Sequence, residues 1–206
     1  MKSAVATIAS VIYALRKTRL KLRLNRQPAR QPRKKAANNW RMPCEISRND
    51  MAASIAAYTR PDLIIPRLRE SDPAGIIEEL TTRLHEQGII GDTLSFYDAA
   101  INHEFLSNSA LPTGIATPHA RSMQVRRLTL VIGRASEPLI WGMQESWPVE
   151  YIFLLAVPPT DGLDYLSLLS GIAGFSRRPE LLARLHAATD ARCIYDLLKE
   201  ITVCSG

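Results

Sequence analysis

Hydrophobic and polar positions alternate in a regular way only after about Pro61. Four aliphatic residues recur at the spacing of one helical face: Ile76, Ile77, Leu80 and Leu84. Asp72 suits the N-cap before them, Pro73 suits the first helical position, and Gly88 suits the position just past the end. The pattern therefore predicts a helix that begins at Pro73 and ends before Gly88.

Three apolar segments have the character of strands. Residues 62–68 (DLIIPRL) are apolar, but Pro66 restricts them to an edge strand or an extended entry. Residues 127–134 (RLTLVIGR) alternate, which predicts a half-buried strand. Residues 149–157 (VEYIFLLAV) are almost all apolar, which predicts a central strand covered on both faces.

Further helices are predicted over residues 93–104, 161–175, 179–186 and 189–201, with Thr189 as the cap of the last one. Residues 107–114 (SNSALPTG) have the composition of a surface loop. Strands interspersed with helices over about 140 residues predict an α/β fold, with a sheet flanked by helices on both faces.

Charge divides the chain into two parts. Residues 1–50 contain 13 Lys and Arg against Glu45 and Asp50, a net charge of +11, whereas the rest holds 13 basic and 18 acidic residues, a net charge of −5. The positive net charge of the whole chain, +6, therefore comes entirely from its first 50 residues. We expect no nucleic-acid binding by the folded domain, while the basic segment has the charge to contact anionic surfaces.

The first 58 residues are predicted to be a basic, mostly disordered extension, followed by one folded domain over residues 59–203. Residues 25–50 are polar, basic and interrupted by proline, so they bury too little apolar surface to order. A helix over residues 4–24 stays open. The apolar run of residues 4–15 is too short to span a bilayer, and the basic residues after it argue against a cleaved signal peptide. Met51 is an alternative start of translation.

The cysteines give no sign of a metal site or of a disulfide framework. Cys44, Cys193 and Cys204 form an odd set without a C-x-x-C pair, which favours a reducing compartment. Nucleotide-binding and serine-hydrolase fingerprints do not occur in the sequence.

The segment Thr113–Arg121 (TGIATPHAR) carries the candidate chemistry. Gly114 permits an unusual turn, and Pro118 fixes its own φ while it holds Thr117 extended, so the backbone is stiff just before His119. A neutral imidazole can attack phosphorus near pH 7 and release the phosphoryl group again. A histidine alone in a loop is more often a structural residue, so the motif needs support from its surroundings.

That support comes from a resemblance. The run GIATPHARS, the strand LTLVIGRA, the segment PLIWG and the run PVEYIFLLAVPPTDGLDYLSLLSGIAGF resemble the type-2 enzyme IIA domain of the bacterial phosphoenolpyruvate-dependent sugar phosphotransferase system, in its mannitol, fructose and nitrogen-related branches. The resemblance covers roughly residues 58–203. It implies an α/β fold with a mixed sheet between helices.

The resemblance also implies a function for His119. This residue would accept a phosphoryl group from a histidine phosphocarrier protein and pass it to a IIB partner, as a phosphotransferase component in sugar uptake or its regulation. The domain would act in the cytoplasm, without a metal or an organic cofactor. Because phosphoryl transfer depends on positioning and on stabilising oxygen charge, donors or cations should surround His119.

Two positions depart from the family pattern. Sixteen residues before the active histidine the family usually carries arginine, where this chain has His103. The second family histidine, at the start of the helix after the central strand, is replaced by Tyr165. Arg121 can restore positive charge, Tyr165 can donate through its hydroxyl, and His103 is either a pH-dependent phosphate contact or a helix-end residue. With Thr117, these residues are the phosphate-contact candidates.

Two alternatives stay open, and the departures support the first of them. The chain can be a regulatory IIA-like module that binds protein partners with weak or lost phosphorylation. It can also act chiefly through its basic extension, in which case binding would weaken steeply with salt and disappear without residues 1–50.

Overall fold

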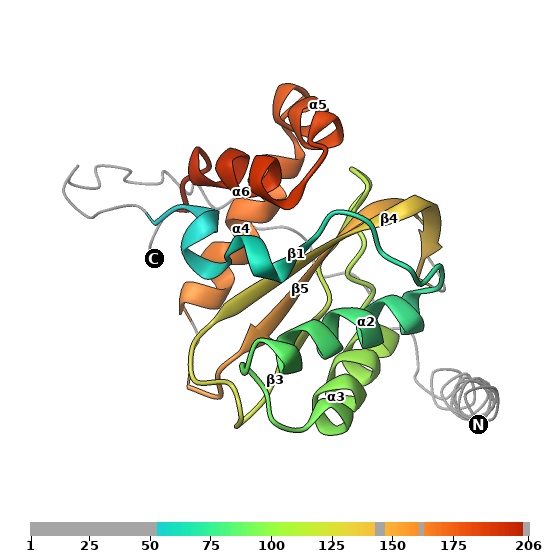
Figure 1. The fold of residues 1–206 in the computed structure, drawn as a ribbon, viewed down its shortest axis with the longest axis vertical. Helices are drawn as coiled ribbons and strands as arrows, with labels where there is room; N and C mark the ends of the chain where they lie inside the picture. Colours follow the sequence, from blue (N-terminus) through green and yellow to red (C-terminus); the bar gives the residue numbers. More distant parts are fainter. Residues whose placement is uncertain (1–52, 143–146, 161–162, 204–206) are drawn as a thin grey trace, which may run out of the picture. The chain divides into compact units, whose positions relative to one another are not determined.

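The computed structural model describes residues 53–142, 147–160 and 163–203. Along the chain in Figure 1 the elements are η1 (Ile55–Tyr58), η2 (Pro61–Leu63), β1 (Ile64–Ile65), α2 (Pro73–Glu86), α3 (Thr93–Leu106), β2 (Ile115–Ala116), β3 (His119–Arg121), β4 (Thr129–Trp141), β5 (Trp147–Val157), α4 (Leu163–Ser176), α5 (Pro179–Ala187) and α6 (Ala191–Lys199).

The strands form one mixed sheet. Its order is β1-β4-β5-β2, and β3 pairs with β5 in line with β2. The β4–β5 pair is antiparallel, whereas β1 runs parallel to β4, and β2 and β3 run parallel to β5. The expected mixed sheet is confirmed, and residues 62–68 supply a short edge strand through β1.

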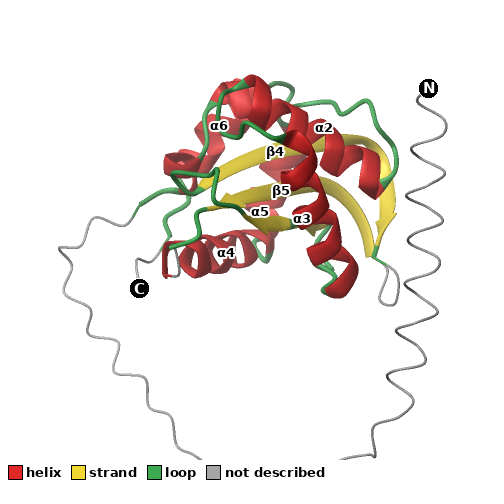
Figure 2. Cartoon of the chain, turned by 90° about the horizontal axis from the view of Figure 1, so that it is seen from below, coloured by secondary structure: helices red, strands yellow, loops and turns green. Residues whose placement is uncertain are grey.

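Helices cover both faces of the sheet, and each face has its own core. On one face α2 and α3 pack their apolar side chains against the strands, through Leu80 and Phe96 among others. On the opposite face α4, α5 and α6 pack through residues such as Phe175 and Leu198. The strands accordingly lie between α2 and α4 in Figure 2. The predicted fold class is confirmed.

Strand β4 differs from its prediction as a half-buried strand of residues 127–134. Leu130, Val131 and Ile132 are all fully buried, because helices cover both faces of the strand. The strand also continues to Trp141, which pairs with Trp147 across the sheet. Alternation at residues 128, 130 and 132 was therefore a poor guide to which face is buried, while the apolar run of β5 was a correct one.

The helix predictions hold best where a cap is strong. Asp72 accepts from the backbone N–H groups of Ala74 and Gly75, each at 3.1 Å, and α2 begins at Pro73 as expected. The predicted cap of the last helix was wrong. Asp190, not Thr189, accepts from the backbone of Cys193 at 2.8 Å, because its carboxylate reaches the free N–H group of the first turn.

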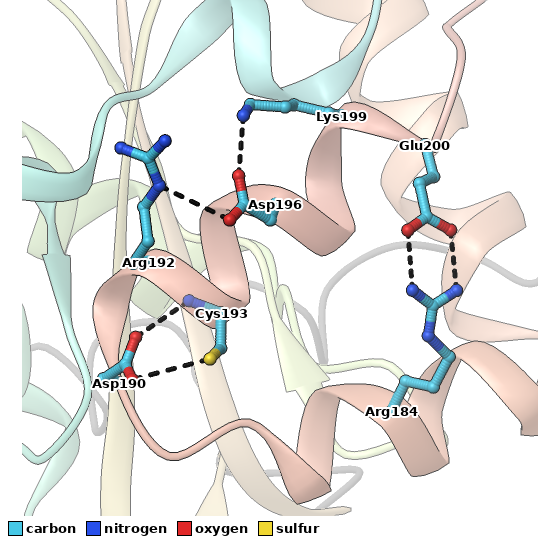
Figure 3. A network of polar contacts seen from close by, with 7 residues as sticks. All are labelled: Arg184, Asp190, Arg192, Cys193, Asp196, Lys199 and Glu200. Carbon is cyan, nitrogen blue, oxygen red and sulfur yellow. Dashed lines mark hydrogen bonds and ion pairs between the residues drawn. The ribbon is translucent and has the colours of Figure 1, made fainter.

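Exposed ion pairs lie on α5 and α6. Arg184 of α5 meets Glu200 with two hydrogen bonds of 2.6 Å, and Asp196 of α6 faces both Arg192 and Lys199 (Figure 3). The opposite side of α6 buries Ile194, Leu197 and Leu198. The polar network therefore lies on the solvent face, and packing of the apolar face holds the helix to the domain.

Most of the expected basic extension, residues 1–58, lies outside the described residues. Its last part is described: η1 contributes the fully buried Ile55 to the core, and the Ile55 N–H donates to the carbonyl of Ile201 at 2.9 Å. The core therefore includes residues that the sequence prediction assigned to the extension. The boundary at residue 58 otherwise stays a prediction.

Candidate functional site

The backbone before His119 is anchored on the central strand. Gly114 has a φ of 87°, a region that a side chain disfavours, and its carbonyl accepts from the N–H groups of Glu150 and Tyr151 at 2.9 and 3.1 Å. Four residues further on, the carbonyl of Pro118 accepts from the N–H of Leu155 at 2.9 Å. The predicted stiff approach is thus fixed to β5 at two points.

Two hydrogen bonds determine which nitrogen of the His119 imidazole carries the proton. Its Nδ1 lies 3.2 Å from the carbonyl oxygen of Thr117, and its Nε2 lies 2.6 Å from the hydroxyl of Tyr165. A carbonyl can only accept, so Nδ1 carries the proton and donates. Nε2 therefore holds the lone pair and accepts from Tyr165, at the start of α4.

The surroundings favour the neutral imidazole. Burial lowers the pKa of His119 below its usual 6.5, and the nearby His103 and Arg121 lower it further, while the hydrogen bond to Thr117 opposes them. Burial likewise raises the pKa of Tyr165 above 10.0, partly offset by Arg121. Near pH 7 the pair is thus a neutral nucleophilic ring and a neutral hydroxyl donor.

The structure brings the predicted site residues together from three segments of the chain: α3, the run from Thr117 to Arg121, and the start of α4. The ring of His103, in the last turn of α3, lies 3.8 Å from the ring of His119 between centroids, at an interplanar angle of 49°. His103 is thus a helix-end residue and a direct neighbour of His119. From the sequence, both interpretations of His103 were open, and the helix-end one was favoured because a histidine is electrostatically favourable at a helix C-terminus. The contact between α3 and β3 could not be inferred from local spacing.

Arg121 and Thr117 are engaged with the backbone. Nη1 of Arg121 donates to the carbonyls of Pro158 and Pro159 at 3.0 and 3.1 Å, and its guanidinium carbon lies 5.9 Å from the centre of the Tyr165 ring. The hydroxyl of Thr117 donates to the carbonyl of Ser109 at 3.3 Å. Thr117 therefore contacts His119 through its backbone carbonyl and turns its hydroxyl elsewhere.

Three residues behind the site, Glu104, Ser109 and Trp141, were not predicted as functional from the sequence. Glu104 Oε1 accepts from the indole N–H of Trp141 at 2.8 Å and from the backbone N–H of Ser109 at 2.9 Å. Their only sequence signal was the position of Glu104, directly after His103. The two partners of Glu104 lie 5 and 37 residues away in the sequence, so no local sequence pattern predicts these contacts.

The described residues hold no cluster of three or more His, Cys, Asp or Glu side chains that could bind a metal ion. Within the same parts of the chain, no helix has the length and apolar character needed to cross a membrane.

Comparison with known proteins gives one family. The family model described as the phosphoenolpyruvate-dependent sugar phosphotransferase system, EIIA 2, matches residues 57–201. A nitrogen regulatory protein of Bradyrhizobium diazoefficiens is 27% identical over 145 residues, which cover 70% of this chain and 94% of the relative.

Solved structures share the fold. The nitrogen regulatory protein IIA-Ntr of Neisseria meningitidis superposes with a TM-score of 0.64 at 23% identity, over 70% of this chain and 98% of that one. The mannitol enzyme IIA of Escherichia coli, in its complex with phosphorylated enzyme IIB, gives a TM-score of 0.57 at 16% identity, over 66% and 94% of the two chains.

Proposed function

The chain belongs to the EIIA 2 family of the phosphoenolpyruvate-dependent sugar phosphotransferase system, and from this premise we propose that it is a phosphoryl carrier with His119 as the acceptor. The donor is the phosphohistidine of a histidine phosphocarrier protein, and the recipient is a IIB domain or another protein partner. We also propose that the protein acts in the cytoplasm. The observation that carries it is the neutral ring of His119, with its proton held on Nδ1 and its lone pair on Nε2.

The transfer follows from that geometry. The Tyr165 hydroxyl first leaves Nε2, and the Nε2 lone pair then forms the N–P bond while the donor's N–P bond breaks and its electron pair returns to the donor imidazole. No proton has to move, because Nδ1 keeps its hydrogen bond to Thr117 throughout. Transfer to the recipient reverses the same bonds.

The neighbours of His119 supply the stabilisation that this step needs. The Tyr165 hydroxyl, displaced from Nε2, is within reach of the new phosphoryl oxygens. Arg121, over the Tyr165 ring, contributes positive charge, and His103 lies against the reacting imidazole. These three residues are the phosphate contacts that we propose.

Radiolabelled phosphoenolpyruvate, enzyme I and a histidine phosphocarrier protein test the proposal directly. Wild type and a His186→Ala control, changed at an exposed histidine of α5, should incorporate label to the same extent, whereas His119→Ala should incorporate none. The bond should be labile to acid and stable to alkali, as a phosphoramidate is. Label that is absent from wild type, or undiminished in His119→Ala, would refute the phosphoryl-carrier role.

A regulatory role is the second candidate, and one contact favours it. In this structure the Tyr165 hydroxyl caps the atom that would react, which suits a module recognised in its unphosphorylated form. The relative matched over 94% of its own length is a nitrogen regulatory protein. A regulatory module should still capture its protein partner as His119→Ala, whereas a carrier alone loses phosphoryl transfer to IIB and has no second activity to keep.

A further inference from the structure

A continuous series of hydrogen bonds reaches His119 from the interior. Trp141 and the Ser109 N–H both donate to Glu104 Oε1, at 2.8 and 2.9 Å. The carbonyl of Ser109 accepts from the N–H of Thr117 at 3.1 Å and from its hydroxyl at 3.3 Å. The carbonyl of Thr117 accepts from His119 Nδ1 at 3.2 Å. Glu104 is thus connected to the reacting ring through Ser109, in the loop after α3, and Thr117, between β2 and β3.

Each step of this series restricts the next one. The Glu104 oxygen fixes the N–H end of the Ser109 peptide, on the loop that follows α3. The Ser109 carbonyl then binds Thr117 twice, through its backbone N–H and through its hydroxyl, which holds the Thr117 residue in place. The carbonyl of Thr117 lies in the next peptide unit, and Pro118 restricts rotation of Thr117 to the extended range, so the placement of Thr117 decides whether its carbonyl faces Nδ1.

The Thr117 carbonyl in turn selects the tautomer of His119. A ring whose Nδ1 has no acceptor is able to carry its proton on Nε2, and a protonated Nε2 has no lone pair with which to attack phosphorus. The proton must therefore stay on Nδ1 for the proposed transfer to occur.

We infer that Glu104 is a positioning residue: through Ser109 and Thr117 it holds the proton of His119 on Nδ1 and keeps Nε2 nucleophilic. This inference rests on the proposed function for its consequence, since a fixed tautomer matters only if Nε2 reacts. Glu104 is not a catalytic residue, because its interactions with His119 run through two other residues.

Nitrogen-15 NMR of histidine-labelled protein tests the inference without any phosphorylation. Long-range couplings to the ring protons show which nitrogen carries the proton, and His119→Gln assigns the signals. Wild type should carry the proton on Nδ1. Glu104→Gln keeps an oxygen that accepts and should retain this tautomer, whereas Glu104→Leu should shift the proton toward Nε2.

Glu79→Leu is the matched control. Glu79 also accepts from two backbone N–H groups, those of Arg69 and Glu70 at 2.9 and 3.2 Å, and it lies in α2, away from the series that ends at His119. Its loss should disturb the fold locally and leave the His119 tautomer unchanged. A shift in Glu79→Leu equal to that in Glu104→Leu would mean that general destabilisation, not positioning, moves the proton.

The outcomes separate this inference from the proposed function. A folded Glu104→Leu that keeps the proton on Nδ1 overturns the positioning role even if His119 is phosphorylated. A wild-type ring with its proton on Nε2 also overturns it, and this measurement needs no variant to fold. A tautomer that responds to Glu104→Leu in a protein that accepts no phosphoryl group supports the positioning role and overturns the carrier function.

If the positioning role and the carrier function both hold, Glu104→Leu should accept the phosphoryl group on the order of 100-fold more slowly than wild type, the loss expected of a misplaced nucleophile.

Discussion

At the scale of single residues, the protonation of His119 decides when the proposed phosphoryl acceptor is able to react. Burial holds the pKa of this ring below 6.5, so the neutral form persists to lower pH than in an unfolded chain. An NMR titration of the His119 ring proton should have its midpoint below pH 6.5. A midpoint at or above that value would contradict the prediction.

The same shift links stability to pH. The unfolded chain binds the proton of His119 more tightly than the folded chain does. The contribution of His119 to the free energy of unfolding is therefore fully present above the pKa of the unfolded chain, and it is lost as pH falls through the pKa of the folded chain. His119→Gln should weaken this dependence on the acid side.

His103 offers a second prediction at this scale. The position lies against His119, and arginine there carries a charge that does not titrate. His103→Arg should speed phosphoryl acceptance by on the order of tenfold, which corresponds to about 1.4 kcal/mol of added stabilisation. The rate of label incorporation measures it, and His85→Arg places the same charge on the exposed side of α2 as a control. Equal gains in both variants would assign the effect to general charge.

At the scale of elements, two glycines should respond to alanine in opposite ways. A Cβ at Gly133 in β4 would lie 2.7 Å from Cδ1 of the buried Leu68, so Gly133→Ala should destabilise the domain by about 1–3 kcal/mol. Gly174, in the last turn of α4, has open space around its missing Cβ, and Gly174→Ala should stabilise the domain by about 0.5 kcal/mol. Urea unfolding measures both, and a stable Gly133→Ala would show that Leu68 can repack freely.

The elements also show what sequence alone can predict. The α2 helix was predicted to the residue at its start, because Asp72 and Pro73 act locally. The burial of Val131 was missed, because it depends on α2 and α3 packing over the sheet from another part of the chain. His119 was predicted from its stiff local approach together with the family resemblance, whereas Glu104 accepts a hydrogen bond from Trp141, 37 residues away, a relation that no local pattern contains.

At the scale of the whole molecule, the uneven distribution of charge along the chain predicts that membrane binding and phosphoryl acceptance belong to different parts of the chain. The +11 charge of residues 1–50 should bind vesicles containing anionic lipid, with an affinity that falls steeply as salt rises. A variant that begins at Met51 should lose this binding and should still accept the phosphoryl group at the wild-type rate. Vesicle sedimentation measures the first and label incorporation the second. Vesicle binding that survives the deletion would assign it to the folded domain.

The interrupted edge of the sheet has a consequence for the behaviour of the protein in concentrated solution. Beside β5, β2 and β3 are only two and three residues long, and Thr117 and Pro118 separate them. A long, regular edge strand is a template for pairing with other chains, and short segments broken by proline are poor templates. The break just before His119 therefore also protects this edge against aggregation.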